Sequence, residues 1–115
     1  MIRSSADQIE AERELPQPLF KALGDAGLFQ LALPRAIGGP EIDLPSYVQV
    51  LEELGKADAS TAWIVNQCAI FATYAARMPS DIARLIWIDT PRSVVANTPV
   101  PSARAVVVPG GYQVT

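Results

Sequence analysis

Residues 28–39 read LFQLALPRAIGG and residues 51–63 read LEELGKADASTAW, and these two stretches decide the fold. In the first, Phe29, Leu31 and Leu33 alternate with smaller or polar residues, which predicts a short extended segment that ends at the following proline. The Gly-Gly-Pro sequence after it predicts a turn within a loop. In the second stretch, the sequence Asp-Ala-Ser predicts the corner at which one helix ends and the next begins.

The apolar spacing, with the prolines and glycines between the segments, predicts five helices over residues 6–14, 17–26, 44–57, 62–78 and 80–88. Ser5 and Gln8 have the spacing of a capping box at the start of the first helix. Gly27 suits the left-handed position that ends the second. Asp43 or Leu44 is the expected cap of the third helix, and Pro45 is tolerated in its first turn.

The third and fourth helices are expected to form the core of the domain. Tyr47, Leu51 and Leu54 are spaced four and three residues apart, which predicts the buried side of the third helix. Residues 62–78 are apolar on nearly every side, and a helix of that kind is normally surrounded by protein. We therefore expect Ile70, in the middle of this helix, to be buried.

The character of the sequence changes after the last predicted helix. Residues 94–96, 106–108 and 112–115 are rich in β-formers, and a glycine pair between the last two segments suits a hairpin turn. The chain is therefore predicted to be mainly α-helical. It comprises a helical domain over residues 1–91 and the beginning of a β domain over residues 92–115.

The predicted hairpin indicates whether the chain is a whole protein or a fragment of one. A lone hairpin is marginally stable in water, and an apolar edge strand tends to aggregate. We expect the chain to be an amino-terminal fragment whose β domain continues beyond Thr115.

Composition limits the classes of function. The 115 residues are 50% hydrophobic, enough for one core, and their formal net charge is −3. Nucleic-acid binders usually carry a basic stripe, so we expect no nucleic-acid partner. Asn66, Gln67 and Thr73 interrupt the apolar run over residues 62–76, which argues against a membrane-spanning helix. The single cysteine and the absence of an apolar leader predict a cytoplasmic protein.

The side chains exclude several kinds of active site. The sequence contains no histidine, so it cannot supply a Ser-His-Asp triad or a histidine-ligated zinc site. It also lacks the glycine motifs that bind phosphate groups. Glu52 and Glu53 are adjacent on a predicted helix and point in different directions, so both are expected on a solvated face. We assign no catalytic residue and no metal ligand within this chain.

One cysteine and four aromatic residues complete the set of candidates. Cys68 is expected to behave as a small buried hydrophobe, because no base or cation stands near it in sequence to activate the thiol. Trp63, Phe71, Tyr74 and Trp87 are interpreted as core residues. The alternative is that they line one wall of a pocket for an apolar or aromatic ligand.

Asn66 and Gln67 stand on the same predicted apolar helix. Buried polar groups need hydrogen-bond partners, and backbone, water or a bound ligand can supply them. The two amides therefore favour the pocket interpretation slightly.

The two quoted stretches resemble the amino-terminal helical domain of the acyl-CoA dehydrogenase superfamily, in which a helix pair ends in a Gly-Gly loop and a later helix ends at an Ala-Asp-x-Ser corner. The sequence STAW at residues 60–63, Trp87 and the sequence GGY at residues 110–112 are similar to the flavin-dependent monooxygenase branch, which includes two-component aromatic hydroxylases and desulfurisation enzymes. True acyl-CoA dehydrogenases carry Thr-Glu-Pro followed by Ala-Gly-Ser where this chain reads NTPVPS over residues 97–102.

The resemblance implies a fold and a cofactor. The fold is an up-down helical domain followed by the first strands of a truncated β-barrel domain. In the full-length protein, a flavin (FAD or FMN) lies between that barrel and a carboxy-terminal helical bundle. The resemblance assigns the flavin-facing loop to Asn97, Thr98, Pro99 and Ser102. The fragment alone is expected to be inactive and not to retain flavin.

The resemblance also implies a substrate and partners. The amino-terminal helices roof the substrate cavity, which assigns its wall to Trp63, Asn66, Gln67, Ile70 and Tyr74. The substrate is expected to be a small apolar or aromatic molecule, hydroxylated with O2 and with flavin that a separate reductase has reduced. A homo-oligomer is expected for the full-length protein. Two alternatives stay open: a genuine acyl-CoA dehydrogenase, and a helical interaction module without a cofactor.

Overall fold

A computed structural model describes residues 1–90, 93–95, 100 and 102–115. The α-helices in this part of the chain are α1 (Ala6–Glu12), α2 (Gln17–Asp25), α3 (Leu44–Ala57), α4 (Ala59–Phe71) and α5 (Ser80–Trp87). The short 3-10 helices are η1 (Arg3–Ser5), η2 (Leu28–Gln30), η3 (Arg35–Ile37) and η4 (Ala72–Arg77). The strands are β1 (Ala105–Val108) and β2 (Gly111–Val114). The fold is therefore mainly α, as predicted.

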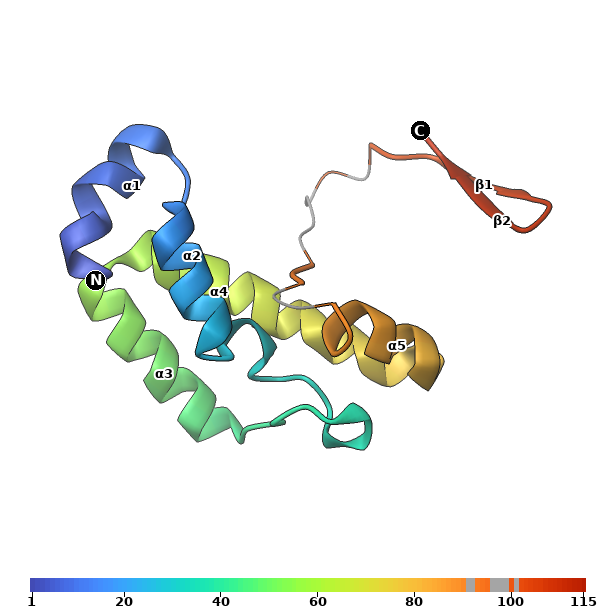
Figure 1. The fold of residues 1–115 in the computed structure, drawn as a ribbon, viewed down its shortest axis with the longest axis horizontal. Helices are drawn as coiled ribbons and strands as arrows, with labels where there is room; N and C mark the ends of the chain where they lie inside the picture. The colour runs from blue at the N-terminus through green and yellow to red at the C-terminus, as the bar shows by residue number, and fades with distance from the viewer. Residues whose placement is uncertain (91–92, 96–99, 101) are drawn as a thin grey trace.

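The corner between α3 and α4 organises the helical part (Figure 1). The Asp43 carboxylate accepts a hydrogen bond from the Ser46 backbone N–H at 2.9 Å and caps α3. The Asp58 carboxylate accepts from the Thr61 backbone N–H at 2.5 Å and caps α4. Of the two residues expected to cap α3, Asp43 is the cap, and Asp58 caps α4 at the predicted Asp-Ala-Ser corner. Each carboxylate satisfies an N–H group that the helix leaves unpaired. Gly27 also adopts the expected left-handed conformation, with φ of 73°.

The helices bury two apolar clusters. The larger cluster joins α1, α2 and η2 to α3 and α4, and its members include Leu19, Leu23, Phe29, Tyr47, Leu54, Val65 and Ala69. The smaller cluster lies where the Gly-Gly loop meets η4 and α5, and it contains Leu33, Ile37, Ala72, Ala75, Ala83 and Trp87. Half of these residues are alanines, whose small side chains let the backbones approach closely.

The Gly-Gly loop is held against α5. The Arg84 guanidinium donates a hydrogen bond to the Ile37 carbonyl oxygen at 3.1 Å. Gly38 has φ of 101°, which side chains rarely adopt. A Cβ atom at Gly39 would lie 2.1 Å from the Leu33 carbonyl oxygen. Both positions therefore require glycine, and the Gly-Gly sequence is needed for the loop to pack against Leu33 and α5.

The first quoted stretch is not extended, and that prediction was wrong. Leu28–Gln30 forms the 3-10 helix η2, and the Leu33 N–H donates to the Gln30 carbonyl at 2.9 Å. Phe29 and Leu33 are nevertheless buried. A single extended segment leaves its backbone groups unpaired, whereas turns satisfy them locally, so local hydrogen bonding overrode the alternating pattern.

The predicted capping box is also absent. The Ser5 hydroxyl donates to the Met1 carbonyl at 3.1 Å, and the Gln8 amide donates to the Glu12 carboxylate at 3.0 Å. The cause is η1, which runs directly into α1, so that Ser5 has helical backbone angles instead of those of a cap.

The fourth predicted helix begins and ends earlier than expected. The helix α4 starts at Ala59, ends at Phe71 and tightens into η4. Its core side is buried, but Ile70 is 45% exposed. The expectation that Ile70 is buried was therefore wrong, because within the described residues no segment covers this side of α4.

The predicted hairpin is confirmed. Strands β1 and β2 pair antiparallel in the register Ala105↔Val114 to Val108↔Gly111, and Gly110 in the turn has φ of 86°. Figure 1 shows the hairpin apart from the helices. Residues 93–95 are not in a strand, whereas Ala96 lies outside the described residues. The boundary between residues 91 and 92 falls on undescribed residues and stays a prediction.

Candidate functional site

Four of the five predicted wall residues share the outer side of α4 and η4. Trp63, Gln67, Ile70 and Tyr74 follow one another at intervals of four, three and four residues, the spacing of neighbours on a helix surface. Trp63 is 64% exposed and Tyr74 is 49% exposed, whereas Gln67 is partly buried. The structure thus brings these residues together on an apolar surface that the described part of the chain leaves open.

Asn66 is placed differently from the other wall residues. It lies toward α3, where the Tyr47 hydroxyl donates to Asn66 Oδ1 at 2.8 Å and lies 3.2 Å from the Asn66 carbonyl oxygen. Tyr47 is buried, and burial raises the pKa of its hydroxyl. The hydroxyl therefore stays protonated at neutral pH and acts as a donor.

The four aromatic residues divide between core and surface. Trp87 is buried, and its carbonyl oxygen accepts a hydrogen bond from the Gln30 side chain at 2.6 Å. Phe71 is partly buried and stacks on Tyr74, with ring centroids 5.9 Å apart and an interplanar angle of 11°. The core interpretation is confirmed for Trp87 and wrong for Trp63 and Tyr74, whose rings are available for contacts outside the helical core.

The predicted flavin-facing loop is described only at its end. Asn97, Thr98 and Pro99 lie outside the described residues. Ser102 is exposed, and its backbone N–H donates to the Val100 carbonyl at 2.9 Å. Ser102 is therefore a surface residue in this structure.

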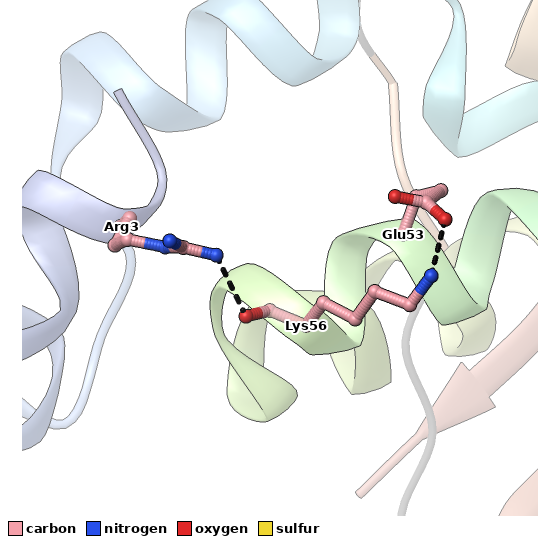
Figure 2. Close-up of polar contacts among 3 residues, drawn as sticks. All are labelled: Arg3, Glu53 and Lys56. Atoms are coloured by element: carbon pink, nitrogen blue, oxygen red, sulfur yellow. Dashed lines mark hydrogen bonds and ion pairs between the residues drawn. The ribbon is translucent and has the colours of Figure 1, made fainter.

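The paired glutamates are on a solvated face, as predicted. Glu53 lies 2.5 Å from the Lys56 ammonium group, and Arg3 donates to the Lys56 carbonyl oxygen at 3.3 Å near the end of α3 (Figure 2). The Glu53 hydrogen bond and charge raise the pKa of Lys56. Glu52 is also exposed. The arrangement is a surface ion pair with a cation at a helix carboxyl end, where it complements the helix dipole.

The cysteine thiol and the potential metal ligands show no sign of a reactive site among the described residues. Cys68 is buried, and burial raises the pKa of its thiol, as expected of an inert cysteine. In the ranges that the structure describes, no group of three potential metal ligands occurs.

No described helix combines the length and apolar character needed to cross a membrane.

The sequence-based reasoning missed the link between Tyr47 and Asn66. Tyr47 was assigned only an apolar role on α3, although its hydroxyl group also had to find a partner once buried. A polar residue on an apolar helix was the available signal, because Asn66 needed a partner too. Their separation of 19 positions hid the pairing.

The sequence profile described as "Acyl-CoA dehydrogenase, N-terminal domain" matches residues 1–88, which include both quoted stretches and all five α-helices. The chain belongs to this family. In this member of the family, Trp63, Ile70 and Tyr74 are exposed along α4 and η4.

Three relatives match different shares of the chain. The oxygenase component of the FADH(2)-dependent resorcinol hydroxylase of Rhizobium sp. (strain MTP-10005) is 30% identical over 100% of the chain and 28% of its own length. The oxygenase component of p-hydroxyphenylacetate 3-hydroxylase of Acinetobacter baumannii is 26% identical over 96% of the chain and 26% of its own length. A probable acyl-CoA dehydrogenase, YngJ of Bacillus subtilis (strain 168), is 37% identical over 52% of the chain and 16% of its own length.

The chain spans less than a third of the length of each of these relatives. No solved structure matches it significantly.

Proposed function

We propose that the chain is the amino-terminal part of the oxygenase component of a flavin-dependent monooxygenase that hydroxylates a small aromatic molecule. The observation that carries the proposal is the extent of the similarity. The two hydroxylase relatives match 100% and 96% of the chain, whereas the acyl-CoA dehydrogenase relative matches 52%. A shared helical domain alone accounts for the shorter match but not for the longer ones.

The outer side of α4 would form one wall of the substrate cavity. Trp63, Ile70 and Tyr74 offer apolar surface against which an aromatic ring can pack, and their contact with the ring would exclude water. Gln67 and Asn66 supply amide groups at the two borders of this surface. None of these five side chains is a carboxylate or a histidine, so their role is to bind and orient the substrate.

A flavin, when bound, supplies the oxygen chemistry that protein side chains lack. We assign its contacts in this chain to Asn97, Thr98, Pro99 and Ser102. The exposed position of Ser102 is compatible with such a contact. The name of the resorcinol hydroxylase specifies FADH(2), which favours FAD over FMN here.

We infer a separate flavin reductase as a partner, because both hydroxylase relatives are named as oxygenase components. We also infer a cytoplasmic location, which suits the free, buried Cys68. A homo-oligomer remains part of the proposal on the family resemblance alone.

The test uses the product of the complete reading frame that contains this chain. Chemically reduced FAD, air and either resorcinol or p-hydroxyphenylacetate are supplied, so that no reductase is needed. We expect a hydroxylated product with one added oxygen, measured by mass spectrometry. Failure to bind flavin and to turn over either probe would contradict the proposal and favour a helical interaction module.

A second candidate is a genuine acyl-CoA dehydrogenase. The observation in its favour is the identity of 37% to the probable acyl-CoA dehydrogenase over 60 residues. Oxidation of an acyl-CoA ester with an artificial electron acceptor, without oxygen incorporation, would support this candidate over the monooxygenase.

A further inference from the structure

The contact between Tyr47 and Asn66 sets the orientation of one wall residue. The Tyr47 hydroxyl lies 2.8 Å from Asn66 Oδ1 and 3.2 Å from the Asn66 carbonyl oxygen. The hydroxyl donates to Asn66 Oδ1, and the Asn66 carbonyl oxygen is a second, more distant acceptor. The side-chain oxygen of Asn66 is thereby used within the domain.

The other end of the Asn66 amide is left for a different partner. Asn66 Nδ2 makes no hydrogen bond with any residue in the described ranges, and Asn66 is only partly buried. In this arrangement the Tyr47 hydroxyl engages the amide oxygen of Asn66, which leaves the two N–H groups of Nδ2 for another partner. Asn66 therefore presents an N–H donor.

This donor borders the apolar surface proposed to contact the substrate. Trp63 precedes Asn66 by three residues and Ile70 follows it by four, so both are its neighbours on the surface of α4. Gln67, at the opposite border, makes no recorded hydrogen bond within the described residues, so either end of its amide can turn to a ligand. Of the two amides, only Asn66 has a side-chain hydrogen bond to another described residue.

We propose that Tyr47 is a positioning residue that holds Asn66 so that its side-chain N–H donates to an oxygen of the aromatic substrate. The inference rests on the proposed function and narrows the substrate class to aromatic molecules that carry an acceptor oxygen, such as a hydroxyl or a carboxylate. Tyr47 acts from α3 and does not touch the substrate. Asn66 makes the contact.

A double-mutant cycle tests the coupling of the two residues. In the product of the complete reading frame, Tyr47→Phe keeps the buried ring and removes only the hydroxyl, and Asn66→Ala removes the donor. Calorimetric titration with resorcinol and with p-hydroxyphenylacetate gives the Kd of each variant. We expect Tyr47→Phe and Asn66→Ala each to raise Kd about three- to tenfold, the range for one neutral hydrogen bond. The double variant should be no weaker than Asn66→Ala.

The controls separate positioning from a general loss of structure. Tyr112→Phe makes the same chemical change on β2, outside the helical domain, and should leave Kd unchanged. Thermal melting of each variant identifies one that does not fold. Were Tyr47→Phe such a variant, an unchanged Kd in Asn66→Ala would still overturn the inference.

The possible outcomes distinguish this inference from the proposed function. If the wild-type protein binds either probe and Tyr47→Phe binds it equally well, the inference is overturned while the proposed function stands. Independent, multiplicative effects of the two substitutions would overturn it as well. If the wild-type protein binds neither flavin nor probe, both proposals fail.

Discussion

Thr61 carries a buried polar atom that the fold does not satisfy. Its side chain is 0% exposed, and Oγ1 has no hydrogen-bond partner in the part of the chain that the structure describes. Its backbone N–H, by contrast, is used by the Asp58 cap. A buried hydroxyl without a partner lowers stability by about 1–3 kcal/mol.

Thr61→Val should therefore raise the free energy of unfolding, by about 1 kcal/mol, because it removes the hydroxyl at nearly constant volume. Urea denaturation of the helical chain measures the change. Thr73→Val is the matched control, since the Thr73 hydroxyl donates to the Ile70 carbonyl at 2.6 Å and should gain nothing from removal. A less stable Thr61→Val variant would show that the hydroxyl has a partner in solution.

Asp43 makes stability depend on pH. The Ser46 backbone N–H, and then the Ser46 hydroxyl, hold the pKa of the Asp43 carboxyl below its ordinary value of 3.8. A carboxyl with a lowered pKa stabilises the folded state fully above its unfolded value and loses this effect as pH falls through the folded value. The stability difference between wild type and Asp43→Ala should thus be constant near neutral pH and shrink below about pH 4. Urea titrations at several pH values measure it, and a difference that does not change with pH would contradict this account.

At the scale of elements, the Gly-Gly loop tolerates little change at Gly39. Gly39→Ala should destabilise the chain by at least about 3 kcal/mol, because the new Cβ atom would meet the Leu33 backbone at 2.1 Å and the loop would have to move. Thermal melting monitored by circular dichroism gives the comparison. Gly55→Ala is the matched control inside α3, where the nearest side-chain atom is 3.9 Å away, and it should stabilise by about 0.5–1 kcal/mol. Equal effects at the two glycines would contradict the packing described here.

The sequence predicted elements well where the signal was local and repeated. The caps at Asp43 and Asp58 depend on neighbouring residues, and both could be predicted. The turn η2 could not be, because apolar alternation is common to a buried strand and to a buried turn. The capping box at Ser5 failed because η1 precedes α1, and short 3-10 helices leave little trace in sequence.

At the scale of the whole molecule, the sequence did not reveal which sides of the apolar helix α4 are covered. Val65 and Ala69 are fully buried, whereas Trp63, Ile70 and Tyr74 are exposed. Hydrophobicity is similar on both sides of α4, so its periodicity carries no information about burial. Their helical spacing could predict that Trp63, Gln67, Ile70 and Tyr74 share one side of the helix, but the pairing of Asn66 with Tyr47 needed the packing of α3 on α4.

This uneven burial predicts that a charge will have different effects on the two sides of α4 in the 115-residue chain. Val65→Asp should prevent folding, because it places an unpaired charge in the core at a cost of several kcal/mol. Ile70→Asp should lower the free energy of unfolding by only about 1 kcal/mol, because Ile70 is 45% exposed. Chemical denaturation of both variants measures the contrast. A fully unfolded Ile70→Asp chain would mean that another segment covers this side of α4.

The most direct test of the central claim follows the oxygen atom. The complete reading frame is expressed, and the purified protein is supplied with reduced FAD, an aromatic probe and ¹⁸O₂. The account predicts a hydroxylated product that carries one oxygen atom from the labelled gas. A product without the label, or oxidation of an acyl-CoA ester in its place, would contradict the assignment as a monooxygenase.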